Sequence, residues 1–228
     1  MSVPVQQLRC ADAREAEDLS AFLARLLHYD RAAVVRVQAG GPEGPRPELA
    51  VFGRPPSFEV LAVRAARLAG PARLDTTVSA GELLESIGEA EFAMPAPVTG
   101  PPWAGVLPPR GAWRDLPGLP DADGMRQAVA SAVAEFRARD EELPEERRTR
   151  AERDRIGREI WSRTLGDTPL PLRAVHAAQS LGFLRPGVPA ALLASGSWLR
   201  LRTPFGSIAL RTAGLGALSV TPTRPHTH

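Results

Sequence analysis

Residues 198–211 read Trp-Leu-Arg-Leu-Arg-Thr-Pro-Phe-Gly-Ser-Ile-Ala-Leu-Arg, two alternating segments joined by a Pro-Phe-Gly turn. Successive side chains of a β-strand point to opposite faces, so this pattern predicts a hairpin with two different faces. The apolar face carries Leu199, Leu201, Ile208 and Leu210. The cationic face carries Trp198, Arg200, Arg202 and Arg211. Guanidinium groups this close repel one another unless an anion lies opposite them: an acidic patch of the same chain, a protein partner or a phosphate backbone.

Three helices are predicted upstream of the hairpin. The first begins at a cap on Asp121 or Asp123 and ends near Glu142, the second covers 145–165, and the third follows Pro171 and covers 172–181. Acidic residues and arginines mix at helical spacing in the second helix, which is typical of a solvated face with intrahelical ion pairs. Residues 121–222 are therefore expected to form a helical half with a terminal hairpin, and 223–228 a disordered tail.

The order helix, turn, helix, hairpin across 150–211 is also the order of a winged helix-turn-helix. In that interpretation the helix at 172–181 enters the major groove, the hairpin is the wing, and the residues that can face base edges are Arg173, His176, Gln179 and Ser180. The simpler interpretation is structural, since three helices and a hairpin are common and a hairpin needs a solvated face. Both interpretations remain open at this point.

The first part of the chain, residues 1–94, is predicted to form an α+β half. Asp12 can cap a helix that ends at Tyr29 and carries one apolar stripe. Strands are expected at 33–38, 49–52 and 74–78, with GGPEGPRPE (40–48) as a long hairpin tip and a short helix after Ser79. Residues 58–68 fit either a helix or a strand, and the strand is preferred.

A proline-rich segment with two tryptophans, Trp103 and Trp113, joins the halves at 95–120. So much proline is incompatible with regular helix or sheet, and a polar linker would not carry two indoles. We expect an extended belt whose indoles lie against the protein, with a proline-rich ligand for a partner's aromatic groove as the alternative. The predicted fold class is α+β, with an N-terminal antiparallel sheet, a long amphipathic helix, this connection and the helical half.

Composition excludes several chemistries. All 28 basic residues are arginine, and asparagine is also missing, so a lysine Schiff base, a phosphate-loop lysine and an Asn-linked glycan are excluded. The 26 acidic residues leave a net charge of +2, a smaller surplus than a non-specific nucleic-acid binder normally carries. Cys10 is the single cysteine and is expected to be a small buried hydrophobe or an idle thiol. No signal or membrane span is visible, so a cytoplasmic location is expected.

Catalysis at neutral pH would depend on His28 or His176, with a carboxylate as orienting partner. No spacing supports such a site: the chain has no G-x-S-x-G, H-E-x-x-H, G-x-G-x-x-G after a strand, or C-x-x-C motif, and no metal or cofactor is predicted. The remaining pair, His226 and His228, lies in the expected tail. An enzyme of unrecognised type using His28 or His176 is therefore the third hypothesis for function.

Three stretches, LPPRGAW (107–113), RIGREIWSRTLGDTPLPLRAVHAAQSLGFL (155–184) and LRLRTPFGS (199–207), resemble segments of uncharacterised proteins from high-GC Gram-positive (actinobacterial) bacteria. The resemblance implies a bacterial cytosolic origin and a folded body that includes Trp113 and Trp161, and it implies no activity. The leading functional hypothesis is a non-enzymatic interaction or adaptor protein whose partner is an unidentified protein. A DNA-binding regulator using 150–211 is the second.

Overall fold

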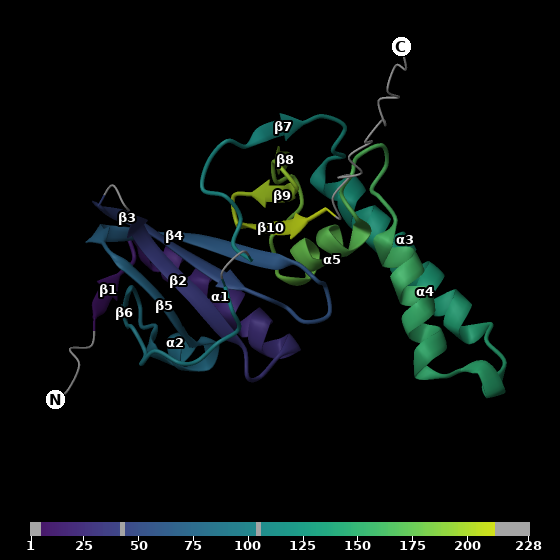
Figure 1. The fold of residues 1–228 in the computed structure, drawn as a ribbon, viewed down its shortest axis with the longest axis horizontal. Helices are drawn as coiled ribbons and strands as arrows, with labels where there is room; N and C mark the ends of the chain where they lie inside the picture. Colours follow the sequence, from purple (N-terminus) through teal and green to yellow (C-terminus); the bar gives the residue numbers. More distant parts are fainter. Residues whose placement is uncertain (1–5, 42–43, 104–105, 213–228) are drawn as a thin grey trace, which may run out of the picture.

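The centre of the fold is one antiparallel sheet of eight strands, to which both halves of the chain contribute (Figure 1). The computed structural model describes residues 6–41, 44–103 and 106–212. The strand order is β5-β2-β3-β4-β10-β9-β8-β7. The strands are β2 (Val34–Gly41), β3 (Gly44–Gly53), β4 (Leu61–Ala72), β5 (Leu74–Ser79), β7 (Arg114–Leu116), β8 (Ala191–Ser195), β9 (Trp198–Thr203) and β10 (Gly206–Arg211). Strands β1 (Gln7–Arg9) and β6 (Glu91–Ala93) form a separate pair. The α+β class is confirmed.

The two halves meet where β10 pairs with β4. Only three register pairs make this seam: Ser207 with Val63, Ile208 with Ala62, and Ala209 with Leu61. Each half brings four neighbouring strands, β2 to β5 from the first and β7 to β10 from the second. The predicted terminal hairpin therefore exists, but it lies in the middle of a larger sheet.

Three helices contact one face of the sheet, which we call the inner face: α1 (Ala13–Tyr29), α2 (Ala80–Ser86) and α5 (Leu172–Ser180). Helices α3 (Ala122–Glu141) and α4 (Arg150–Ser162) pack against each other and against α5, with a 3-10 turn at Glu145–Arg147 between them. Helix α1 begins where the Asp12 carboxylate accepts a hydrogen bond from the amide of Glu15, and its Leu19, Phe22 and Leu23 are fully buried. The main core lies between these helices and the inner face.

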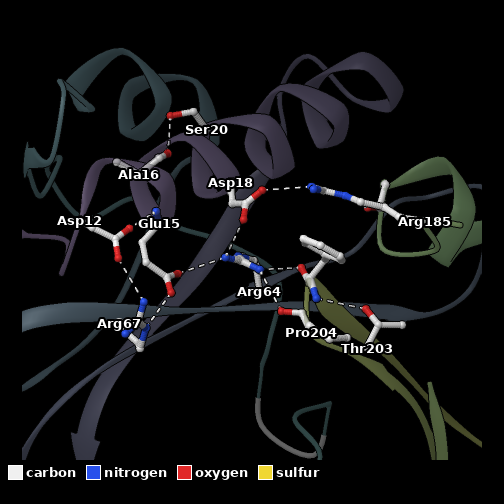
Figure 2. A network of polar contacts seen from close by, with 12 residues as sticks. Asp12, Glu15, Ala16, Asp18, Ser20, Arg64, Arg67, Arg185, Thr203 and Pro204 are labelled. Atoms are coloured by element: carbon white, nitrogen blue, oxygen red, sulfur yellow. Dashed lines mark hydrogen bonds and ion pairs between the residues drawn. The ribbon is translucent and has the colours of Figure 1, made fainter. Parts of the chain in front are cut away.

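A buried arginine fastens α1 to the seam between the halves (Figure 2). The Arg64 side chain on β4 is 6% exposed, and its Nη2 lies 3.1 Å from Glu15 and 3.5 Å from Asp18 on α1. Its Nη1 donates to the carbonyl oxygen of Phe205, in the turn between β9 and β10, at 2.9 Å. One side chain thus connects a helix of the first half with a turn of the second.

The proline-rich belt crosses the opposite, outer face of the sheet. Trp103 is only 8% exposed and packs in a cluster with Phe52, Leu61, Val63 and Trp198, while Trp113 is half-buried against the same cluster. The amide of Val98 donates to the carbonyl of Thr77 on the edge strand β5. The indoles therefore lie against the protein as predicted.

The structure corrects three expectations about local structure. The belt is not wholly irregular, because Arg114–Leu116 pairs with β8, a strand that was not predicted. In the tip predicted at 40–48, the described residues 40–41 and 44–48 are strand, and Pro47 is accommodated at the register shift between Arg46 and Glu48, where a missing amide is tolerated. The helix at 145–165 is broken, and α4 starts only after its Thr149 cap. The strand pair formed by β1 and β6 was also not predicted. Residues 58–68 are mainly strand, as preferred.

Helices α3 and α4 form an antiparallel pair that projects away from the sheet, which we call the arm (Figure 1). Its charges are matched within the pair: Arg163 forms two hydrogen bonds to Glu135, at 2.6 and 2.8 Å, and Arg139 forms two to Glu159, both at 2.8 Å. The hydrogen bond from Arg139 is the main reason that the pKa of Glu159 is lowered to about 2. The positive charge of the arm is thus largely compensated.

Candidate interaction face

Strand register places the predicted cationic residues on the outer face, beside the belt. Trp198 lies opposite Arg211, Arg200 opposite Ala209, and Arg202 opposite Ser207. Directly paired residues of antiparallel strands point to the same side, so the arginines share one face, as the alternation predicts. The expectation of a solvated face is wrong at Trp198, which packs in the cluster with Trp103 and is only 8% exposed.

Arg200 is half-buried, and its described contacts are all with neutral groups. Its Nε donates to the buried hydroxyl of Ser207 at 2.9 Å, and its guanidinium carbon lies 5.7 Å from the centre of the Trp113 ring. Burial is the main cause that lowers the pKa of Arg200, and the neighbouring positive charge of Arg202 adds to it. Both effects disfavour the cation, so this position holds a positive charge at a cost.

The exposed neighbours of Arg200 are likewise uncompensated. Within the described residues, no carboxylate forms an ion pair with Arg200, Arg202 or Arg211. The guanidinium carbon of Arg211 lies 5.1 Å from the centre of the Trp198 ring, a cation–π contact with a neutral group. The hairpin arginines therefore differ from Arg139 and Arg163 of the arm, which are held by carboxylates.

Two hollows open on the outer face, and residues of the belt line both of them. The first hollow has a volume of about 670 Å³ and lies over Ala50, Phe52 and Val63, under belt residues 107–111. Arg46, Arg110 and Arg200 line it, and so does Glu48. Arg110 donates to the side-chain oxygen of Gln38 at 3.1 Å and to the carbonyl of Gly40 at 3.4 Å. Even without Arg46, the described lining of the first hollow carries two arginines, Arg110 and Arg200, against one glutamate.

The second hollow has a volume of about 710 Å³ and lies at the seam. Its floor includes Leu61, Trp198 and Ala209, and prolines 55, 56 and 101 form part of its wall. Arg54 and Arg211 stand at its rim and are both exposed. The two hollows bring together Arg200, Arg211 and Trp198 from the predicted site, with Arg54 and Arg110, which sequence reasoning missed. The sequence signal that could have pointed to Arg54 and Arg110 is the pair of prolines beside each of them, Pro55–Pro56 and Pro108–Pro109.

The predicted residues of α5 lie on the inner side and contact other parts of the chain. His176 stacks on Trp161, with ring centres 4.4 Å apart, and meets the edge of Phe58 at 5.1 Å. Burial lowers the pKa of His176. Arg173 is half-buried, 3.9 Å from Glu59, and the side-chain oxygen of Gln179 is buried without a hydrogen-bond partner in the described part of the chain. None of these three residues lines either hollow.

Neither candidate catalytic histidine lines either hollow. His28 is exposed at the end of α1 and packs edge-on against Tyr29. Among the described residues, no group of three or more His, Cys, Asp or Glu could hold a metal ion. None of the described helices has both the length and the apolar character required to cross a bilayer. His226 and His228, and the tail predicted at 223–228, lie outside the described residues.

The chain is an α+β protein built from two units that share one antiparallel sheet across a short seam. Residues 3–105 match the family model of a domain of unknown function (DUF8010), and residues 108–215 match that of another (DUF8185). The boundary between the matches lies inside the belt predicted at 95–120. A search of curated proteins found no match.

Proposed function

We propose that this protein is a non-enzymatic interaction protein that binds an acidic segment of a protein partner on its outer face, beside the belt. The observation that carries the proposal is the state of Arg200, a half-buried cation next to Arg202 with only neutral described contacts. A buried charge is costly until an opposite charge pairs with it. A carboxylate entering the first hollow would relieve this cost at Arg200 and gain charge-assisted hydrogen bonds.

The contrast with the arm supports this location. Two arginines of the arm, Arg139 and Arg163, are neutralised by bidentate contacts to Glu159 and Glu135, so neither offers much attraction to an added anion. Arg110, Arg200 and Arg202 have no described carboxylate partner. A small net charge of +2 for the whole chain is therefore compatible with a local positive field on the outer face.

An acidic protein segment fits better than a DNA duplex. A recognition helix must present one face to the major groove, whereas Arg173 and His176 of α5 face Glu59, Phe58 and Trp161. A wing must also project, whereas β10 pairs with β4 inside the sheet. The winged-helix hypothesis stays a prediction, and these contacts do not favour it.

Binding of a poly-glutamate peptide, followed by fluorescence anisotropy at several salt concentrations, tests the proposal. We expect the double variant Arg200→Gln, Arg202→Gln to bind about ten-fold more weakly than the unchanged protein. The matched control is Arg137→Gln, Arg158→Gln, which removes two exposed arginines of the arm and leaves the same net charge. Equal losses of peptide affinity in both double variants would show that only net charge matters and would refute a specific site. Tighter binding of a DNA duplex than of the peptide would favour the DNA hypothesis.

The setting that we propose is the cytoplasm of a bacterium of the high-GC Gram-positive group. Support comes from the resemblance of residues 107–113, 155–184 and 199–207 and from a single cysteine, Cys10, which is buried. Separation of a tagged protein between soluble, membrane and exported fractions of such a bacterium would test the location.

A further inference from the structure

The second hollow combines an apolar floor with a cationic rim. Leu61, Trp198 and Ala209 of its floor are buried residues of the outer-face cluster, and prolines 55 and 101 add rigid apolar wall. Its volume of about 710 Å³ lies in the range of sites for small organic ligands. The hollow lies at the seam and is separate from the first hollow, which Arg200 lines.

The two arginines of the rim are available to a ligand. Arg54 and Arg211 are exposed, and within the described ranges neither forms an ion pair with a carboxylate. Glu59 is the single carboxylate among the described lining residues, and its Oε2 lies 3.9 Å from Nε of Arg173 on α5. Glu59 thus lies near a cation outside the hollow, and the described lining of the hollow carries two arginines against one glutamate.

The wall between Arg54 and Leu61 is held in place from behind. Phe58 is buried and packs edge-on against both Tyr29 and His176, with ring centres 5.2 and 5.1 Å apart. Glu59 has a φ of 52°, in the left-handed region that non-glycine residues rarely adopt, so the surrounding contacts must fix this turn. A wall fixed in this way makes the hollow largely preformed, which lowers the entropic cost of binding.

We infer that the second hollow binds an apolar carboxylate: an aryl or alkyl group rests on Leu61 and Trp198, and its carboxylate is held by Arg54 and Arg211. A purely apolar ligand would leave both guanidinium groups unused, and a small polar anion would leave the floor empty. The same chemistry occurs in a free organic acid and in the C-terminal residue of a peptide that ends in an aromatic side chain. The inference does not depend on the acidic segment proposed for the first hollow.

Titration with 4-phenylbutyrate, followed by isothermal calorimetry and by tryptophan fluorescence, tests the inference on the full chain. We expect saturable binding of 4-phenylbutyrate and binding about ten-fold weaker for 4-phenylbutanol, which lacks the charge, and for acetate, which lacks the ring. The double variant Arg54→Gln, Arg211→Gln should weaken 4-phenylbutyrate binding to a similar extent. The double variant Arg137→Gln, Arg158→Gln, at two exposed positions of the arm, is the matched control for the loss of two arginines.

Two short peptides ending in phenylalanine, one with a free and one with an amidated C-terminus, distinguish the sources. Binding of the free-ended peptide alone, or more tightly than 4-phenylbutyrate, identifies a polypeptide terminus, and the reverse identifies a small organic acid. The inference is overturned if neither compound binds, if amide and carboxylate bind equally, or if the Arg54 and Arg211 variant binds as the unchanged protein does. Arg200→Gln, Arg202→Gln should retain 4-phenylbutyrate binding, so failure of the acidic-segment proposal is distinguishable from failure here.

Discussion

Arg64 illustrates how a single charged side chain can fix the position of several elements. Its guanidinium is buried, contacts two carboxylates of α1 and donates to a carbonyl in the β9–β10 turn. Replacing Arg64 by Met would keep most of the apolar volume and leave Glu15 and Asp18 without their shared cation. Because uncompensated buried charge is costly, we expect Arg64→Met to lower the free energy of unfolding by about 3–5 kcal/mol in urea titrations.

The control for that measurement is Arg67→Met, which removes a second partner of Glu15. The Arg67 side chain is 64% exposed, so water screens its ion pairs and the loss should be much smaller. Equal losses at the two positions would show that burial does not distinguish them. A further expectation is that Glu15→Gln partly restores stability in the Arg64→Met background, because it removes one of the unpaired charges.

Cys10 should be an unreactive thiol whose ionisation weakens the fold. It is 1% exposed, and burial, with the nearby carboxylates of Glu15 and Asp12, raises its pKa to about 11. The unfolded chain loses the thiol proton from about pH 9, whereas the folded chain retains it, so stability falls as the pH rises from about 9 to about 11. We expect the free energy of unfolding to fall by about 1–3 kcal/mol more in the unchanged protein than in Cys10→Ala over this interval.

Alkylation with iodoacetamide at pH 8 provides an independent measurement for Cys10. The folded protein should react far more slowly than the protein in urea, because the thiolate is scarce and the side chain is covered. Rapid alkylation of the folded protein would contradict the buried position.

At the scale of elements, the belt behaves as part of the core although most of it lacks regular structure. Trp103 is buried among Phe52, Leu61 and Val63, whereas Trp113 is half-buried. Trp103→Ala should therefore lower the free energy of unfolding by about 3–5 kcal/mol, and Trp113→Ala by clearly less, in matched urea titrations. A negligible effect at Trp103, or cleavage of the belt by protease with both halves still folded, would make this segment a linker.

Elements with a periodic pattern or a cap were predictable from the sequence, and short ones were not. Asp12, Ser79 and Asp121 each accept the capping hydrogen bond expected at the start of a helix. Strands β9 and β10 follow their alternation, which placed Arg200 and Arg202 correctly on one face. Strands β1, β6 and β7 have three residues each, too few to show a period, and the apolar run of β8 does not alternate.

At the scale of the whole molecule, the candidate site depends on a pairing that no local pattern encodes. Ala209 pairs with Leu61, far earlier in the chain, and this pairing brings Arg211 and Trp198 to Arg54 and prolines 55 and 56. The sequence identified the hairpin arginines because alternation is local. It could not identify Arg54 or Arg110 as their neighbours, since that proximity arises from the seam and from the path of the belt.

The seam also predicts how the two halves depend on each other. When residues 1–105 are produced alone, β4 keeps β3 but loses β10 and becomes an open edge, and Arg64 loses its acceptor on Phe205, so this half should aggregate or unfold at lower urea than the full chain. Co-production with residues 106–228 should restore solubility and yield a complex that unfolds in one transition by fluorescence and circular dichroism. Two independently stable halves that do not associate would contradict the seam.

The two strands of the seam are also synthesised at different times. Strand β4 leaves the ribosome long before β10, and the edge formed by Leu61, Ala62 and Val63 must wait for Ser207–Ala209. An unpaired edge strand is a template for pairing with other chains, and long-range strand pairing is slow to form. Nascent chains on one messenger would thus expose identical edges side by side. The long segment between β4 and β10 lengthens the time during which a neighbouring copy could pair with β4 in place of β10.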